Sequence, residues 1–209
     1  PMEHAGEVSA VAYSPDGKRI LTGTAGVENQ ISLWNPIDGQ RVATLGVDSL
    51  PIRAVAFSSD GEWLAAGGDS GGGRIWNART GTPHAKPCKT DGGLLSLAFR
   101  PDSKFLLTGS ASQKAQLWTV EDATPLGQPL EHAADVHAVM FAEGGKLIAT
   151  ADRQGHLLVW WNAFADKRGG PLRYDGQVLD VDVTADGRGL ATAGDDRTAR
   201  IWDLPTGLP

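Results

Sequence analysis

The sequence predicts an all-β fold built from five copies of one antiparallel unit, and three observations lead to it. Tryptophans recur at intervals of 42 residues, at Trp34, Trp76, Trp118, Trp160 and Trp202. A run in which apolar residues alternate with other residues precedes each tryptophan, as at 8–13 and 94–99, and a turn rich in Asp, Gly or Pro follows most runs. Because alternation with period two is typical of a strand with one buried face, we expect several short strands per copy.

Each copy divides into three or four expected strands. The first strands are expected at 8–13, 52–57, 94–99, 136–141 and 178–183. A second strand follows the turn, as at 105–108, and a glycine-rich hairpin leads to a third strand that ends in the tryptophan. Four copies add a fourth apolar segment, such as 42–45 or 125–130. The prolines of the latter suit an outer edge strand, where a missing N–H is tolerated.

The copies predict a single domain over residues 1–209. Its repeats span approximately 4–46, 47–88, 89–130, 131–172 and 173–209. The first turn lies two residues farther from its tryptophan than the other four, so the first repeat carries a two-residue insertion, which we place in the loop 26–30.

Composition excludes several classes of partner. The formal charge is −6 and the longest basic run is Lys167-Arg168, so nucleic acid is not an expected partner. No apolar run reaches the roughly 18 residues of a membrane span, and residues 1–4 do not resemble a secretory signal. We therefore expect no membrane partner and favour the cytoplasm, although removal of a signal by processing would leave localisation unknown. Cys88 is the single cysteine and is expected to be an ordinary buried residue.

A unit of about 42 residues that ends in Ile201-Trp202-Asp203 resembles the WD40 repeat of β-propeller proteins. Residues 190–203, LATAGDDRTARIWD, follow the family pattern most closely. The resemblance implies a propeller of five four-stranded blades, of which the last lacks its outer strand. It also allows the chain to be a segment of a larger, seven-bladed propeller. The Pro-Asp-Gly turns and the link PLGQPLEH at 125–132 look most like repeat arrays of large bacterial proteins.

The resemblance implies a hydrogen-bonded set in each blade, made of a histidine, a Ser or Thr, an aspartate and the tryptophan. By register the histidines are His4 and His132, the aspartate is Asp196, and the hydroxyl residues are Thr22, Thr108, Thr150 and Thr192. The remaining positions hold other residues, namely Asp48, Thr90 and Tyr174 for histidine, Ala66 for threonine, and Glu28, Ser70, Ser112 and Gln154 for aspartate. No repeat therefore carries the full set in register. We expect the two histidines to be structural and to bind no metal.

The fifth repeat stops where its outer strand would begin, and only three residues precede His4 to supply one. Two arrangements satisfy this: a portion of a longer propeller, or a ring that closes with five blades or through a second copy. Because an open array exposes two blade faces and an unpaired strand edge, we expect a homo-oligomer if the ring is incomplete.

No coherent catalytic set is present in the sequence. The letters GDSGG at 68–72 are those that surround the nucleophile of chymotrypsin-like proteases, but here they fall in the turn between the second and third strands of repeat two. Glycines suit the positive φ angles of such a turn. Asp180 and Asp182, on one side of an innermost strand, are the only unusual acids. We expect no catalytic, cofactor or metal site.

Function is therefore sought in binding. In the family, partners dock on the rim of loops around the central channel. The matching positions are Arg53, Leu95, His137 and Leu179 early in the first strands, and Asp69, Arg153 and Asp195 before the turn acid. Trp161 follows Trp160 and should point to the opposite face. We expect a non-enzymatic scaffold for protein or peptide partners. The alternatives are a propeller-based enzyme of the hydrolase type and an engineered or excised propeller fragment with no activity of its own.

Overall fold

The computed structural model confirms the all-β prediction. It describes residues 1–26, 28–48, 50–84, 86–161, 166–167, 172–173, 177–184 and 188–203. Within them, strands form five separate antiparallel sheets, and one short 3-10 helix, η1 (Glu143–Gly145), lies between two strands. We call these sheets blades 1 to 5 in chain order.

Each blade follows the same strand order as the sequence. Blade 1 contains β1 (Glu7–Tyr13), β2 (Ile20–Ala25), β3 (Asn29–Trp34) and β4 (Arg41–Asp48). Blade 2 contains β5 (Ile52–Phe57), β6 (Trp63–Gly68), β7 (Gly72–Asn77) and β8 (Cys88–Lys89). Blade 3 contains β9 (Leu94–Phe99), β10 (Phe105–Ser110), β11 (Lys114–Thr119) and β12 (Pro125–Glu131).

The last two blades differ at their outer edge. Blade 4 contains β13 (Val136–Ala142), β14 (Leu147–Asp152) and β15 (His156–Trp161), and two short strands, β16 (Asp166–Lys167) and β17 (Leu172–Arg173), both pair with β15. Blade 5 has three strands in its described part, β18 (Val178–Val183), β19 (Gly189–Gly194) and β20 (Ala199–Asp203). The expected turn at 185–187 lies outside the described residues.

Consecutive blades pack face to face, and a tryptophan lies at each contact. Trp76 packs with Leu21 and Leu33 of blade 1, and Trp160 packs with Leu107 and Leu117 of blade 3. Trp118 and Trp202 occupy the same place against blades 2 and 4. All five tryptophans are buried. The 42-residue period therefore records one buried position per blade, and in four of the five blades that position lies at the contact with the preceding blade.

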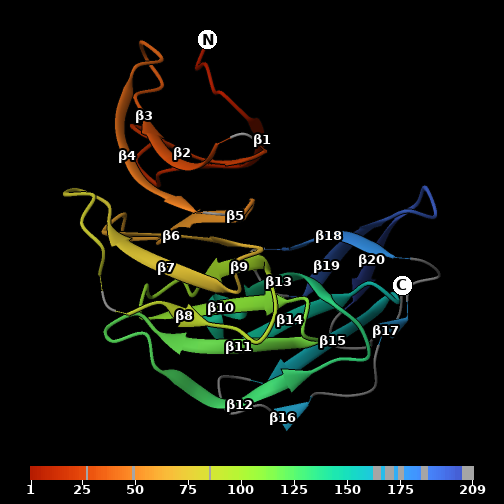
Figure 1. The fold of residues 1–209 in the computed structure, drawn as a ribbon. Helices are drawn as coiled ribbons and strands as arrows, with labels where there is room; N and C mark the ends of the chain where they lie inside the picture. Colours follow the sequence, from red (N-terminus) through yellow and green to blue (C-terminus); the bar gives the residue numbers. More distant parts are fainter. Residues whose placement is uncertain are drawn as a thin grey trace.

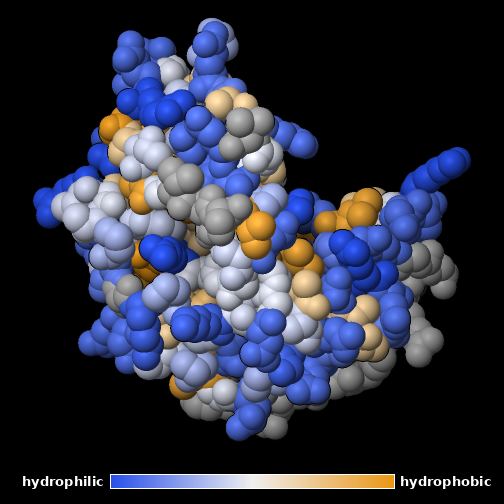
Figure 2. Space-filling view, viewed as in Figure 1, coloured by the Kyte–Doolittle hydropathy of each residue, from blue (hydrophilic) through white to orange (hydrophobic). Residues whose placement is uncertain are grey.

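The blades follow one another along an arc whose ends do not pack together in the part of the chain that the structure describes (Figure 1). Val8 of blade 1 is 45% exposed, whereas its register counterparts Ile52, Leu94, Val136 and Val178 are at most 1% exposed. Ile201 of blade 5 is 74% exposed, whereas its counterpart Leu33 is 2% exposed. The two open faces are the two surfaces that meet at every internal interface, and the space-filling view shows the hollow between the ends (Figure 2).

The N-terminal segment contacts its own blade. Nη2 of Arg41 donates to the carbonyl of Glu3 at 3.4 Å, and a ring nitrogen of His4 lies 3.0 Å from the carbonyl of Met2. In the structure residues 1–4 therefore lie beside β3 and β4 (Figure 1).

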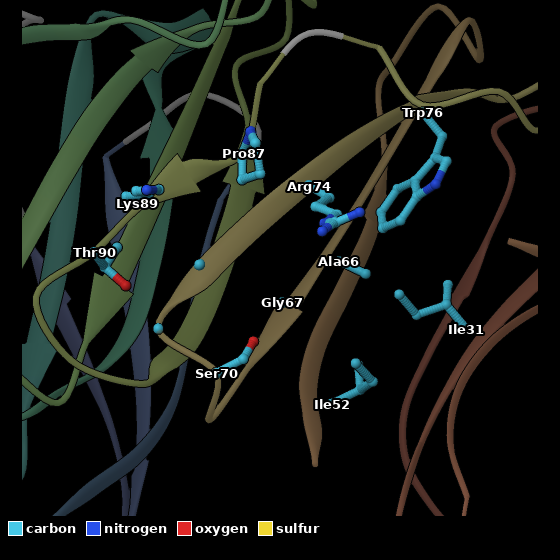
Figure 3. A pocket seen from close by; sticks show the side chains of 12 residues that line it. Ile31, Ile52, Ala66, Gly67, Ser70, Arg74, Trp76, Pro87, Lys89 and Thr90 are labelled. Atoms are coloured by element: carbon cyan, nitrogen blue, oxygen red, sulfur yellow. The ribbon is translucent and has the colours of Figure 1, made fainter. Parts of the chain in front are cut away.

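The GDSGG stretch forms the hairpin between β6 and β7, as expected. Gly71 has φ +76°, and a Cβ added to Gly68 would lie 1.9 Å from the carbonyl oxygen of Pro51. These two glycines are required by the turn and by the close approach of the preceding loop. The hairpin borders a cavity of about 300 Å³, whose lining includes Ser70 but, among the described residues, no histidine (Figure 3).

Two valines at the same register position, Val136 and Val8, should contribute differently to stability. Val136→Ala should lower the free energy of unfolding by about 2 kcal/mol because it opens a hole in a filled interface. Val8→Ala, at the same register position of blade 1, should change it by less than about 0.5 kcal/mol. Chemical denaturation measures both. Equal losses would show that blade 1 is covered in solution by something that this chain does not supply in the structure.

Candidate functional site

Four blades share one polar contact in their interior. The indole Nε1 donates to a threonine Oγ1 at 2.7–2.9 Å in the pairs Trp34–Thr22, Trp118–Thr108, Trp160–Thr150 and Trp202–Thr192. These threonines are all buried. Because a buried N–H without an acceptor is costly, the hydroxyl position has a structural role in these blades.

His4 and His132 lie where the resemblance places them. Nε2 of His4 is 2.9 Å from Oγ1 of Thr22, and its ring packs 4.6 Å from that of Trp34. Nε2 of His132 is 2.7 Å from Oγ1 of Thr150. Both histidines thus extend the indole–hydroxyl contact of their own blade by one member.

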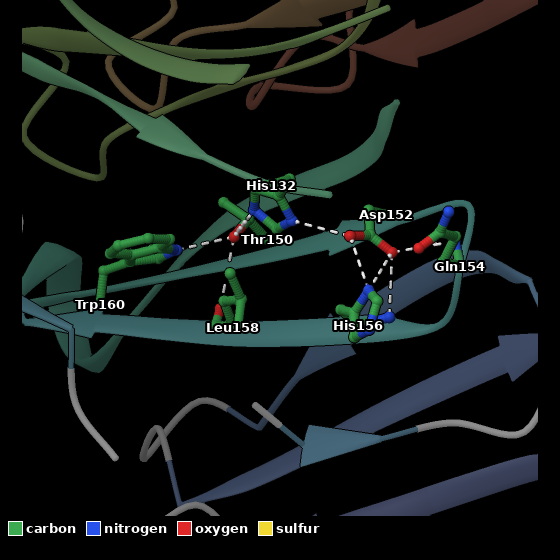
Figure 4. A network of polar contacts seen from close by, with 7 residues as sticks. All are labelled: His132, Thr150, Asp152, Gln154, His156, Leu158 and Trp160. Carbon is green, nitrogen blue, oxygen red and sulfur yellow. Dashed lines mark hydrogen bonds and ion pairs between the residues drawn. The ribbon is translucent and has the colours of Figure 1, made fainter. Parts of the chain in front are cut away.

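Blade 4 completes this set with an acid that register analysis missed (Figure 4). Asp152 is fully buried, and its carboxylate lies 3.3 Å from Nδ1 of His132 and 3.0 Å from Nδ1 of His156. It also accepts from the backbone N–H groups of residues 154 and 156. Since an ionised carboxylate can only accept, both Nδ1 atoms donate to it. The expectation that no repeat has a full set is therefore wrong for blade 4, where the acid stands two residues before Gln154.

The acid expected in blade 5 has a local role instead. Asp196 accepts from the backbone N–H and the hydroxyl of Thr198, both at 2.9 Å, and it faces Arg200. It holds the β19–β20 hairpin. Tyr174, at the histidine position of this blade, lies outside the described residues. The same holds for the side chain of Asp48, which ends β4 and is the histidine position of the second repeat.

Exchange of Asp152 for alanine should be severe. Asp152→Ala leaves two imidazole and two backbone N–H groups without their acceptor, and we expect a loss of about 3 kcal/mol in the free energy of unfolding. Gln154→Ala, at the exposed position where register placed the acid, is the control and should cost less than about 0.5 kcal/mol. Denaturant titration of both variants decides between the two positions.

The rim residues meet in pairs across the first strand and the following hairpin. Arg53 binds Asp69 with two contacts, Nε to Oδ1 at 2.9 Å and Nη2 to Oδ2 at 2.7 Å. Nε of Arg153 donates to Nε2 of His137 and also faces Asp135 at 3.9 Å. In both repeats the partners are 16 residues apart, so the structure brings together rim positions that were predicted separately.

The remaining rim positions are two leucines, Leu95 and Leu179, and one acid, Asp195. Leu95 is half-buried, whereas Leu179 is 54% exposed on β18. Asp195 exchanges two contacts with Gln177, accepting its backbone N–H at 2.8 Å. The orientation predicted for the Trp161 side chain falls outside the described part of the structure.

The rim contacts shift the pKa values of the side chains that make them. The hydrogen bond from Arg53 lowers the pKa of Asp69, and the same contact raises the pKa of Arg53. Burial and then the charge of Arg153 lower the pKa of His137, against a smaller opposing effect of Asp135. The contact with Arg153 also requires Nε2 of His137 to be unprotonated. His137 is therefore neutral at pH 7.

This arrangement predicts a specific titration. His137 should titrate below the ordinary histidine pKa of 6.5, and Arg153→Gln should raise the pKa by removing the nearby charge. Because the folded-state pKa is the lower one, the stability contributed by this group is complete above the unfolded pKa and falls as pH drops below it. NMR titration of the imidazole measures the shift. An unchanged pKa in Arg153→Gln would show that the charge of Arg153 does not contribute and that burial alone lowers the pKa of His137.

Other candidate groups have structural contacts. The carboxylates of Asp180 and Asp182 accept the backbone N–H of the next residue, at 2.9 and 2.8 Å. Cys88 is buried, and burial raises the pKa of its thiol to about 12. Within the described residues no group of three or more His, Cys, Asp or Glu side chains could hold a metal ion. No described helix has the length and apolar character of a membrane span.

Comparison with known proteins agrees with the repeat geometry. The family model of the WD domain, G-beta repeat, matches residues 2–35, 39–77, 81–119 and 171–203. The chain belongs to the WD-repeat family. The matched segments leave out the strands of blade 4 up to Trp161, although that blade holds the most complete polar set.

Relatives of this WD-repeat chain match only part of it. The small ribosomal subunit protein RACK1 of Medicago sativa is 38% identical over 74 residues, which is 35% of this chain and 22% of the relative. RACK1 of Glycine max is 40% identical over 63 residues, or 30% and 18%. An uncharacterised WD repeat-containing protein of Synechocystis is 34% identical over 64 residues, or 31% and 18%. The matches thus span about a fifth of each relative. They come from plants and Synechocystis, so the likeness to large bacterial arrays stays a prediction.

Proposed function

We propose that this WD-repeat chain is a non-enzymatic scaffold that binds a protein or peptide on the rim formed by its first strands and following hairpins. The observation that carries the proposal is the pairing of rim side chains, Arg53 with Asp69 and Arg153 with His137. Each pair is held in place before a partner arrives, yet both arginines remain about half exposed. Preorganised groups lose less conformational entropy on binding, which favours recognition.

The chemistry of the rim suits an extended peptide. Arg153 pairs with a neutral histidine, so its positive charge is only partly balanced by Asp135 at 3.9 Å. Leu179, on the next blade, offers exposed apolar surface. A peptide with an acidic side chain next to an apolar one would match Arg153 and Leu179. The charged contact would set the register of the peptide, and the apolar contact would add buried area.

The relatives support a role within an assembly. Their name describes RACK1 as a protein of the small ribosomal subunit. We infer that the partner of this chain is a protein, because its formal charge of −6 disfavours direct contact with nucleic acid. The open faces of blades 1 and 5 provide a second mode of association, between copies of this chain.

The rim proposal predicts separate effects on binding and stability. Peptides selected on the immobilised chain from a random display library should bind Arg153→Glu at least tenfold more weakly, because a charge is reversed at the contact. Arg53→Glu should weaken them as well. The melting temperature should remain nearly unchanged, since both arginines are exposed.

Lys146→Glu, next to η1, is the matched control for a change of charge away from the rim. It should leave peptide affinity unchanged. If the selected peptides bind the rim variants as tightly as the parent chain, the rim is not the partner site.

A further inference from the structure

The free face of blade 5 differs in polarity from the faces that meet inside the arc. On its inner strand β18, Asp180 and Asp182 are exposed, and they alternate with Val181 and Val183, which pack toward blade 4. The equivalent positions of the other inner strands hold small or apolar residues, namely Ala10 and Ala12, Ala54 and Ala56, Ser96 and Ala98, and Ala138 and Met140. Blade 5 therefore presents two carboxylates where each internal interface has none.

Covering these carboxylates requires hydrogen-bond donors. Each of them accepts the backbone N–H of the next residue, but an ionised carboxylate has room for several donors. A wholly apolar partner would bury both charges without further compensation, which is costly. The free face of blade 5 therefore selects a partner that brings donors to β18.

One internal interface shows where such a donor arrives. Ser96 holds the position of Asp180, and its hydroxyl oxygen accepts the backbone N–H of Val139 on the next blade at 3.2 Å. Val139 corresponds in register to Val11 of blade 1. A blade 1 that docked on blade 5 with the same geometry would direct the N–H of Val11 to Asp180.

Blade 1 carries a second donor, which the internal faces lack. The position of Tyr13 is occupied by phenylalanine in three other blades, at Phe57, Phe99 and Phe141. Inside the arc this position shares an apolar cluster with the position of Asp182, as Phe141 does with Ala98. The added hydroxyl lies at one end of the arc and the added carboxylate at the other, so each supplies what the other needs.

The donors of blade 1 are open to a partner. Val11 is 64% exposed and Tyr13 is 62% exposed. The indole of Trp34, on the same face, is instead buried, with the ring of His4 at 4.6 Å and the guanidinium of Arg41 at 4.8 Å. The available surface of blade 1 is therefore its inner strand, and β1 and β18 are the inner strands at the two ends of the arc (Figure 1).

We propose that the free face of blade 1 in one copy of this chain docks on the free face of blade 5 in a second copy, with donors from Val11 and Tyr13 meeting the two carboxylates of β18. The contact continues the packing that already joins consecutive blades at four interfaces. Within one copy the two faces do not pack together in the part of the chain that the structure describes. The inference deepens the association between copies proposed above and does not depend on peptide binding at the rim.

The first test blocks each face separately. Val11→Glu places a further carboxylate opposite Asp180, and Ile201→Glu puts a charge on the apolar part of the blade 5 face. In sedimentation velocity the parent chain should associate as its concentration rises, whereas each variant alone should stay monomeric. An equimolar mixture of the two variants should form a one-to-one dimer, because each variant retains one intact face.

A second test examines the polar contact. Tyr13→Phe gives blade 1 the residue of the internal faces and removes the donor to Asp182, so association should weaken about tenfold. Asp182→Ala in the Tyr13→Phe background restores the internal pattern and should recover most of the lost affinity. Ile37→Glu, at an exposed apolar residue in the turn between β3 and β4, is the control and should leave association unchanged. All these side chains are exposed, so the melting temperature at low concentration should be the same throughout.

Four results would overturn the proposal. They are a parent chain that is monomeric at every concentration, a blocked variant that associates alone as tightly as the parent chain, a mixture of blocked variants that stays monomeric, and unchanged association in Tyr13→Phe. Peptide affinity at the rim is measured separately, so failure of one proposal can be told from failure of the other.

Discussion

The structure depends on the burial of one indole at each contact between consecutive blades. The ring supplies a large apolar area, but leaving its buried N–H without an acceptor costs free energy. A threonine on the neighbouring strand of the same blade supplies that acceptor in four blades. Because a one-residue slip of a strand would turn the threonine to the other face, the contact also fixes the register of the second and third strands. The innermost strand pairs with the second strand, so its position follows from that register. This alignment brings Arg53 to Asp69 and Arg153 to His137 at the rim.

Much of this architecture could be predicted from the sequence. Strand alternation and the tryptophan interval both reflect burial of one face. Buried positions recur every second residue along a strand and every 42 residues from blade to blade, and both intervals can be read from the sequence. Asp152 could not be placed in this way, because it occupies a strand position that holds Thr24, Gly68, Ser110 and Gly194 elsewhere, and only the fold of the β14–β15 hairpin directs its carboxylate to His132. The pairing of Arg153 with His137 likewise depends on how a hairpin approaches the first strand. The sequence does not decide between a closed ring and an open arc, because periodicity carries no information about the angle between blades.

Blades 2 and 4 show how the same scaffold position can take opposite forms. In blade 4 it is filled by two imidazoles and a buried carboxylate that satisfy one another. In blade 2 the corresponding strand positions hold Ala66, Gly68 and Gly72, and Nε1 of Trp76 has no hydrogen-bond partner among the described residues. Both blades fold because the interface is sustained by the apolar area of the ring, which blade 2 retains in full. The polar set is thus an addition to the interface that a blade can lose without losing its fold.

The two ends of the arc follow from the same repetition. Every blade has one face that receives the tryptophan of the next blade and one that presents its own, so any stack of blades ends with one free face of each kind. Val8, Val11 and Tyr13 lie on the free face of blade 1, which is of the kind that presents its own tryptophan, and Ile201 lies on the free face of blade 5, which is of the receiving kind. These faces are complementary to each other and not to themselves, so contact between copies through them would be heterologous, as in a ring or a filament, and not a two-fold dimer.

Whether such contacts close into a ring depends on the rotation from blade to blade, which is set by the volume of the residues between the inner strands. The glycines opposite Ile52 and Val136, at positions 23 and 109, allow these strands to approach closely, since an added Cβ would lie 2.4 Å and 2.9 Å from those side chains. A larger residue at either position would push the neighbouring blades apart at their inner strands, so these glycines limit which blade-to-blade rotations the chain can adopt.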